Sequence, residues 1–169
     1  MVQAWNNSDG LYLKYGLSKT GSNVAGEYVT TGDLREVKLT LTLSGLTQSE
    51  VIQSDVQILP AGARIKEVEV VTTTAGATGT AIDLGLIRTD RTTELDYDGL
   101  LAAAPIAMHN SAGERTIYTA VTTVPASATG TGALIGTTLA YNGYITCSRT
   151  DATAYTDGVL NVYIRYYIP

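Results

Sequence analysis

Residues 35–43 read REVKLTLTL, and apolar and polar side chains alternate along the stretch. The apolar residues fall on one side of an extended chain, and they are Val37, Leu39, Leu41 and Leu43. Successive side chains of a β-strand point to opposite faces of the sheet. The spacing therefore predicts a strand with one face in a core and the other in contact with solvent.

Similar alternation predicts six further strands, over residues 63–74, 80–88, 115–124, 133–141, 144–149 and 158–168. In the first of these, Val68 and Val70 face inward, and Ile65 is out of step with them unless the strand bulges or ends there. Apolar residues lie on both faces of 115–124, which is typical of a strand in the middle of a sandwich or at an interface. The dipeptide Asn142-Gly143 predicts a two-residue hairpin turn between 133–141 and 144–149, since both residues tolerate positive φ.

The composition favours an all-β fold. The chain of 169 residues holds 26 threonines and 11 tyrosines, and side chains of these kinds pack well on a pleated sheet. The one helix that the sequence predicts is short; it spans residues 98–104 (DGLLAAA) and ends before Pro105. Strands joined by turns such as 59–62 (LPAG) predict a two-sheet β-sandwich, with a jelly roll favoured over an immunoglobulin-like arrangement.

Charge and cysteine content exclude several classes of protein. Sixteen acidic residues against 11 basic ones give a net charge of -5, which argues against nucleic acid or an anionic membrane as a partner. No apolar run approaches the roughly 20 residues that span a bilayer, and the first residues lack the pattern of a signal peptide. Cys147 is the single cysteine, so we expect no disulfide framework.

The inventory of reactive side chains predicts no enzyme, no metal site and no cofactor. His109 is the single histidine, and neither a catalytic triad nor a zinc site can be assembled around it. The acidic cluster consists of Asp90, Glu94, Asp96 and Asp98. It could bind calcium, although Arg88 and Arg91 would oppose a cation, or it could form a glycosidase pair. The simpler interpretation is that Asp98 caps the short helix while the other carboxylates are solvated or pair with the arginines.

Two groups of aromatic residues are candidates for an interface. Residues 1–34 are predicted to form an extended arm ahead of the sandwich at 35–169, and the arm carries Trp5, Tyr12, Tyr15 and Tyr28. It could lie on its own domain or on a neighbour. The last strand carries Tyr163, Arg165 and Tyr167 on one face. This stripe could belong to a core that uses Tyr in place of Phe, to a subunit interface, or to a platform for sugars.

Several short motifs resemble those of the head-decoration, or cement, proteins of tailed bacteriophages. They are DGLYLKYG at 9–16, GEY at 26–28, ILPAGARI at 58–65, IDLGL at 82–86 and DYDGLL at 96–101, together with the closing strand rich in Thr and Tyr. The resemblance implies a jelly-roll-like sandwich, usually oligomeric, that sits on the outer face of a capsid and bridges subunits of the major capsid protein. It supplies no catalytic residues.

The expected function is therefore that of a virion structural protein. It is made in the host cytoplasm and stabilises the capsid shell by binding the major capsid protein from outside. We expect a homo-oligomer, with a trimer favoured over a dimer, and no contact with nucleic acid or membrane. A carbohydrate-binding sandwich of a phage surface or tail-fibre protein is the main alternative. A glycan-cleaving enzyme is the third hypothesis.

Overall fold

The computed structural model describes residues 34–54, 56–76, 81–105, 111–120, 130–150 and 152–168. These residues form nine strands and one short 3-10 turn, Leu43–Gly45. The strands are β1 (Leu34–Thr42), β2 (Val51–Ile52), β3 (Ile58–Leu59), β4 (Arg64–Thr74), β5 (Ala81–Arg88), β6 (Glu94–Pro105), β7 (Arg115–Thr119), β8 (Gly143–Arg149) and β9 (Val159–Tyr167).

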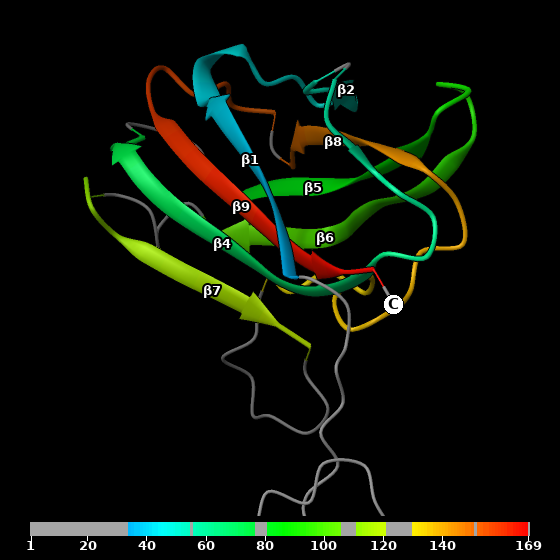
Figure 1. Cartoon of the computed structure of the whole chain (residues 1–169). Helices are drawn as coiled ribbons and strands as arrows, with labels where there is room; N and C mark the ends of the chain where they lie inside the picture. The colour runs from blue at the N-terminus through cyan, green and yellow to red at the C-terminus, as the bar shows by residue number, and fades with distance from the viewer. Residues whose placement is uncertain are drawn as a thin grey trace, which may run out of the picture. The chain divides into compact units, whose positions relative to one another are not determined.

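The strands make two antiparallel sheets, which Figure 1 shows one behind the other. The first has the order β1-β9-β4-β7, and the second has the order β2-β8-β5-β6, with β3 also paired to β8. Because β2 and β3 share one position beside β8, each sheet has four strand positions. Eight positions in two sheets, with the chain passing repeatedly from one sheet to the other, make a jelly roll. The predicted all-β sandwich is therefore confirmed.

The hydrophobic core lies between the two sheets and is built from the predicted alternating faces. Its fully or almost fully buried members include Leu39, Leu41, Ile65, Val68, Val70, Ile82, Leu84, Leu86, Leu100, Leu101, Ile145, Cys147, Leu160, Val162 and Ile164. Ile65 and Val68 both face inward because β4 has a bulge between Ile65 and Glu67 in its pairing with β9. Of the two alternatives at Ile65, a bulge or the end of the strand, the structure has the bulge.

The helix predicted over 98–104 is wrong, since these residues belong to β6. Leu84 of β5 pairs with Leu101, but Leu86 pairs with Asp96, so β6 has several extra residues opposite Gly85. The extra residues form a large bulge. The bulge lies so close to Gly85 that a Cβ there would overlap the main chain of Asp96 and Tyr97. A segment of one or two helical turns has little stability of its own. Burial of leucines in the core of the sandwich determines its conformation instead.

The hairpin predicted at Asn142-Gly143 is also wrong, because 133–141 contains turns and one isolated bridge in place of a strand. Strand β8 already has β5 on one side and β2 and β3 on the other, so no position is left for a hairpin partner. The Asn142 side chain takes a different role: its Oδ1 accepts a hydrogen bond from the Ala61 N–H at 2.7 Å. It thereby braces the predicted turn at 59–62, where Gly62 has φ +83°.

The strand predicted over 115–124 does not lie in the middle of a sheet. Strand β7 ends at Thr119 and pairs only with β4 among the described residues, so it forms an edge of the first sheet. Tyr118 faces the core, whereas Ile117 is 45% exposed. The second half of the stretch, 121–124, lies outside the described residues, as does nearly all of the predicted arm.

Candidate interaction surface

The outer face of the β1-β9-β4-β7 sheet carries the predicted stripe of the last strand. Alternation along β9 buries Val162, Ile164 and Tyr166 and turns Tyr163, Arg165 and Tyr167 outward. The three outward residues are half-buried, because β1 and β4 flank β9 on both sides. The structure thus brings them together on one face. The other predicted interface residues, Trp5, Tyr12, Tyr15 and Tyr28, lie outside the described residues.

Arg165 is the centre of an ion-pair network on this face. Its guanidinium lies 2.8 Å from Oε2 of Glu36, 2.7 Å from Oε1 of Glu67 and 2.7 Å from Oε2 of Glu69. Arg115 of β7 also pairs with Glu69. Hydrogen bonds to Glu67, and then to Glu36, raise the pKa of Arg165 above its ordinary value. The Arg165 side chain is 22% exposed and that of Glu69 only 6%, so the centre of the network is partly withdrawn from water, whereas Glu36 and Arg115 at its ends are exposed.

The network changes the interpretation of Arg165. Each of the three guanidinium nitrogens, Nε and the two terminal ones, meets a carboxylate of its own sheet, so the side chain joins β1, β9 and β4. Sequence reasoning missed these partners because Glu36 and Glu67 come from distant parts of the chain. Their alternation pattern does place them on outward faces, but only the strand order shows that they flank Arg165.

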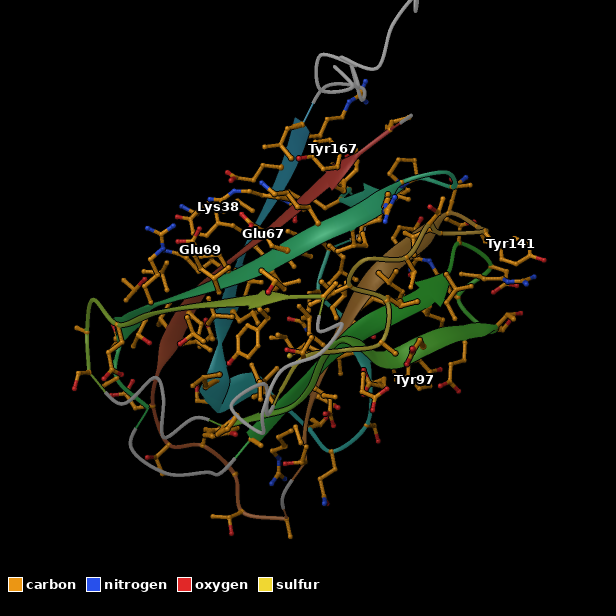
Figure 2. All side chains as sticks on the ribbon, turned by 90° about the horizontal axis from the view of Figure 1, so that it is seen from below. Lys38, Glu67, Glu69, Tyr97, Tyr141 and Tyr167 are labelled. Carbon is orange, nitrogen blue, oxygen red and sulfur yellow. The ribbon has the colours of Figure 1, made fainter. Side chains whose placement is uncertain are left out.

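Other polar contacts continue this arrangement across the sheet. Lys38 Nζ lies 5.6 Å from the centre of the Tyr163 ring, and Figure 2 shows Lys38, Glu67 and Glu69 on the same outer side. Thr40 donates to Asn161 Oδ1 at 2.9 Å, and Asn161 donates to the hydroxyl of Thr73 at 3.0 Å. Apolar groups lie toward the margins, where Leu34 is paired with Tyr167 and is 50% exposed. The face therefore combines a rigid charged centre with aromatic and aliphatic margins.

The predicted acidic cluster is divided between a turn and a strand. The Asp90 carboxylate accepts hydrogen bonds from the N–H groups of Thr92 and Thr93 and from the Thr93 hydroxyl. These bonds, led by that from the hydroxyl, lower the pKa of Asp90. Its oxygens close the turn between β5 and β6. The two arginines lie over tyrosine rings: Arg88 Cζ is 3.5 Å from the centre of the Tyr141 ring, and Arg91 Cζ is 5.1 Å from the centre of the Tyr144 ring.

The remaining carboxylates lie on the outer face of the second sheet. Asp98 does not cap a helix; its N–H donates to Asp96 Oδ1 at 3.4 Å. Two carboxylates that the sequence did not single out interact electrostatically with this cluster. Asp83 accepts a hydrogen bond from the Ala103 N–H at 2.7 Å, and Glu50 accepts one from the Ser148 hydroxyl. Burial, and then Asp98, raises the pKa of Asp96 to about 6, and burial raises the pKa of Asp83 and of Glu50.

The described residues offer little for metal or nucleophilic chemistry. Within those ranges no group of three or more His, Cys, Asp and Glu side chains is placed to hold a metal ion. Cys147 is fully buried in the core, and burial raises the pKa of its thiol. His109 lies outside the described residues. No helix in the described part of the chain is long and apolar enough to cross a membrane.

Comparison with known proteins shows the fold that the chain shares. No protein-family model matches the sequence, and no curated protein matches it. A chain of the cyanophage Pam1 capsid asymmetric unit is similar in structure, with a TM-score of 0.50 and 17% identity, over 93% of this chain and 100% of that one.

Two further capsid chains are similar. The match to a chain of the Ralstonia phage GP4 capsid has a TM-score of 0.52 and 16% identity, over 88% of this chain and 93% of that one. The match to a chain of the acidic stable capsid of Helicobacter pylori bacteriophage KHP30 has a TM-score of 0.50 and 15% identity, over 82% and 90%. At this level of identity, the likeness is one of fold, and the fold is a jelly roll found in chains of three phage capsids.

Proposed function

We propose that the chain is a structural protein of a phage virion, and more specifically a decoration protein that binds the outer surface of the capsid shell and stabilises it. The observation that carries the proposal is the likeness of nearly the whole chain to capsid chains of three phages. The match to the Pam1 chain takes in all of that chain, so it is a similarity between proteins of comparable length. A role as a single small subunit on a larger shell agrees with that size.

The proposed role is non-catalytic. The described part of the sandwich forms its own core between the two sheets, so it does not need the side chains on their outer faces for that core. We assign the contact with the major capsid protein to the outer face of β1-β9-β4-β7, at Tyr163, Tyr167 and Leu34. Tyrosine is enriched in protein interfaces because one rigid ring buries a large area and its hydroxyl can still find a partner. The charged centre around Arg165 holds the four strands in place beneath it.

The experiment is binding of the full chain to shells of the virus's major capsid protein assembled without it. Co-sedimentation measures the bound fraction, and electron cryomicroscopy of the complex locates the chain. We expect binding to the outer surface and a higher melting temperature of the shell. Tyr163→Ala and Tyr167→Ala should weaken binding, while Tyr141→Ala, which removes an exposed tyrosine from the bend before β8, should leave it unchanged.

Three outcomes would contradict the proposal. Absence of binding to the shell, with native particles that lack the chain, would exclude a virion role. Density inside the shell would preserve a virion role but reject outer decoration. Strong binding to glycans that is lost in both tyrosine variants, without binding to the shell, would instead support the carbohydrate-binding alternative.

A further inference from the structure

The edges of the two sheets differ in how they are protected. An edge strand presents unpaired N–H and C=O groups, and proteins usually block such edges with short strands, charges, bulges or covering segments. In the described residues the edges are β1 and β7 of the first sheet, and β2 with β3, and β6, of the second. A comparison of the four shows where another chain could add a strand.

Strands β1, β2 and β3 are protected. The Gln57 side chain crosses from the second sheet and donates through Nε2 to the Lys38 carbonyl oxygen of β1 at 2.7 Å. Strands β2 and β3 have two residues each and are separated by an excursion of the chain. The β1 edge is thus interrupted at Lys38, and the β2 and β3 edge is broken into two short pieces.

Strand β6 is protected over both of its halves. Its second half is covered by residues 130–134, which form three backbone hydrogen bonds: Ala102 N to Gly130 O, Gly132 N to Leu100 O, and Leu134 N to Gly99 O. Its first half is charged, with Glu94, Asp96 and Asp98 at alternate positions. A second strand with similar charges would be repelled from this half.

Among the described residues, strand β7 has neither a bulge nor a segment that covers its outer edge. Its five residues, RTIYT, include no Gly or Pro, and its pairing with β4 runs without a register shift. Threonine, isoleucine and tyrosine all favour strands. The one charged side chain, Arg115, is paired with Glu69 of its own sheet. Figure 1 shows β7 as the outermost strand of the front sheet. Its exposed centre is Ile117.

The hydrogen-bonding pattern fixes which backbone groups of β7 point outward. Thr72 N donates to Glu114 O at 2.8 Å, and Val70 pairs with Thr116 two residues further along each strand. In an antiparallel ladder, hydrogen-bonded pairs alternate with pairs that are not bonded to each other. The N–H and C=O groups of Arg115, Ile117 and Thr119 therefore point away from β4.

We infer that β7 is the contact between two copies of this chain, which pair antiparallel across a two-fold axis at Ile117. A two-fold axis makes the two edges complementary, because each outward N–H of one copy meets an outward C=O of the other. Ile117 then lies opposite Ile117 of the second copy, and Arg115 lies opposite Thr119. The two arginines stay apart, so no like charges face each other across the axis. The product is one continuous sheet of eight strands.

This inference does not depend on the proposed virion role, because it concerns the isolated protein. It also selects a dimer, since a two-fold contact of one edge with itself is closed, whereas a trimer needs two different surfaces. The trimer that the sequence favoured is the competing prediction. A homo-oligomer remains a prediction in either case.

The experiment is size-exclusion chromatography with light scattering on the full chain over a dilution series. We expect twice the mass of one chain at high concentration and dissociation on dilution. Ile117→Pro should give the monomer mass at every concentration. The Ile117 N–H faces away from β4, so proline there removes no hydrogen bond of the monomer. Ile117→Lys is a second variant with the same expected result, and it keeps the backbone donor.

The matched control is Val56→Lys, which places the same charge on a valine that is 89% exposed in the excursion between β2 and β3. It should leave the dimer intact. Hydrogen exchange should show Ile117 and Thr119 amides that are protected at high concentration and exposed on dilution. A chain that is monomeric throughout, a trimer, a dimer that persists in the folded Ile117 variants, or dissociation caused by Val56→Lys would overturn the inference.

Discussion

Replacement of Arg165 by methionine tests whether the charged centre of the outer face stabilises the sandwich. The change keeps an unbranched side chain of similar reach but removes the guanidinium that Glu36, Glu67 and Glu69 share. The cost depends on how well water can solvate each carboxylate that loses its partner. The side-chain exposures of the three are 42%, 15% and 6%, respectively.

The magnitude follows from these exposures. Removal of one partner from a buried ion pair costs about 3–5 kcal/mol, whereas an exposed pair contributes about 0–1 kcal/mol. Glu69 is the most buried but retains Arg115, and Glu36 is open to water, so Glu67 accounts for most of the cost. We expect Arg165→Met to lower the free energy of unfolding by about 2–4 kcal/mol.

The assay is urea unfolding followed by circular dichroism. Arg165→Lys is the first control, because it keeps the charge but not the three separate donor nitrogens. Its free energy of unfolding should lie between those of the wild type and Arg165→Met. The second control is the triple variant Arg165→Met with Glu67→Gln and Glu69→Gln. It removes the carboxylates left without a partner and should be more stable than the single variant. A cost below about 0.5 kcal/mol for Arg165→Met, or a triple variant no more stable than the single one, would show that the network behaves as an ordinary surface ion pair.

Two further predictions concern β6 and the second sheet. Gly85→Ala should lower the free energy of unfolding by about 1–3 kcal/mol, because the new methyl group would overlap the main chain of the β6 bulge; Gly45→Ala, with nothing near its added methyl, should change it little in the same urea titration. Asp96 has a pKa of about 6 in the folded protein, against an ordinary 3.8, so the folded state binds the proton more tightly and the stabilisation is lost as pH rises through 6. The urea midpoint of the wild type should therefore fall relative to that of Asp96→Asn as pH rises from about 4 to 6 and then level off, and parallel curves for the two proteins would contradict the pKa.

Strands with regular alternation could be predicted from the sequence alone. The stretch 35–43 and the closing strand each have one apolar face, and in both strands the structure turns that apolar face toward the core, as expected. The prediction for residues 98–104 was wrong because their small and apolar composition suits a short helix equally well. Burial of Leu100 and Leu101 in the core, beside Gly85, favours the strand instead. The prediction of a hairpin at Asn142-Gly143 was wrong because β5 lies on one side of β8 and β2 and β3 on the other. The turn preference of two neighbouring residues does not show which strands flank β8.

The outer face could be predicted in part. Alternation along β9 correctly placed Tyr163, Arg165 and Tyr167 on one side, since that depends only on parity within the strand. Whether a charged side chain on that face is free to contact another protein, or is already paired within its own sheet, depends on the residues of the neighbouring strands. Those neighbours are separated from Arg165 by about a hundred residues of chain, with Glu67 98 positions away and Glu36 129 positions away.

The bulge in β4 connects the core to the charged centre. Without an extra residue near Lys66, a strand that buries Ile65 would also turn Glu67 toward the core and Val68 toward solvent. The bulge between Ile65 and Glu67 reverses the parity, so that Ile65 and Val68 are both buried while Glu67 and Glu69 reach Arg165. The irregular spacing of Ile65 in the sequence is therefore the local signal for a long-range result. The inserted residue lets Ile65 share the core face with Val68 and Val70 while Glu67 and Glu69 still face Arg165.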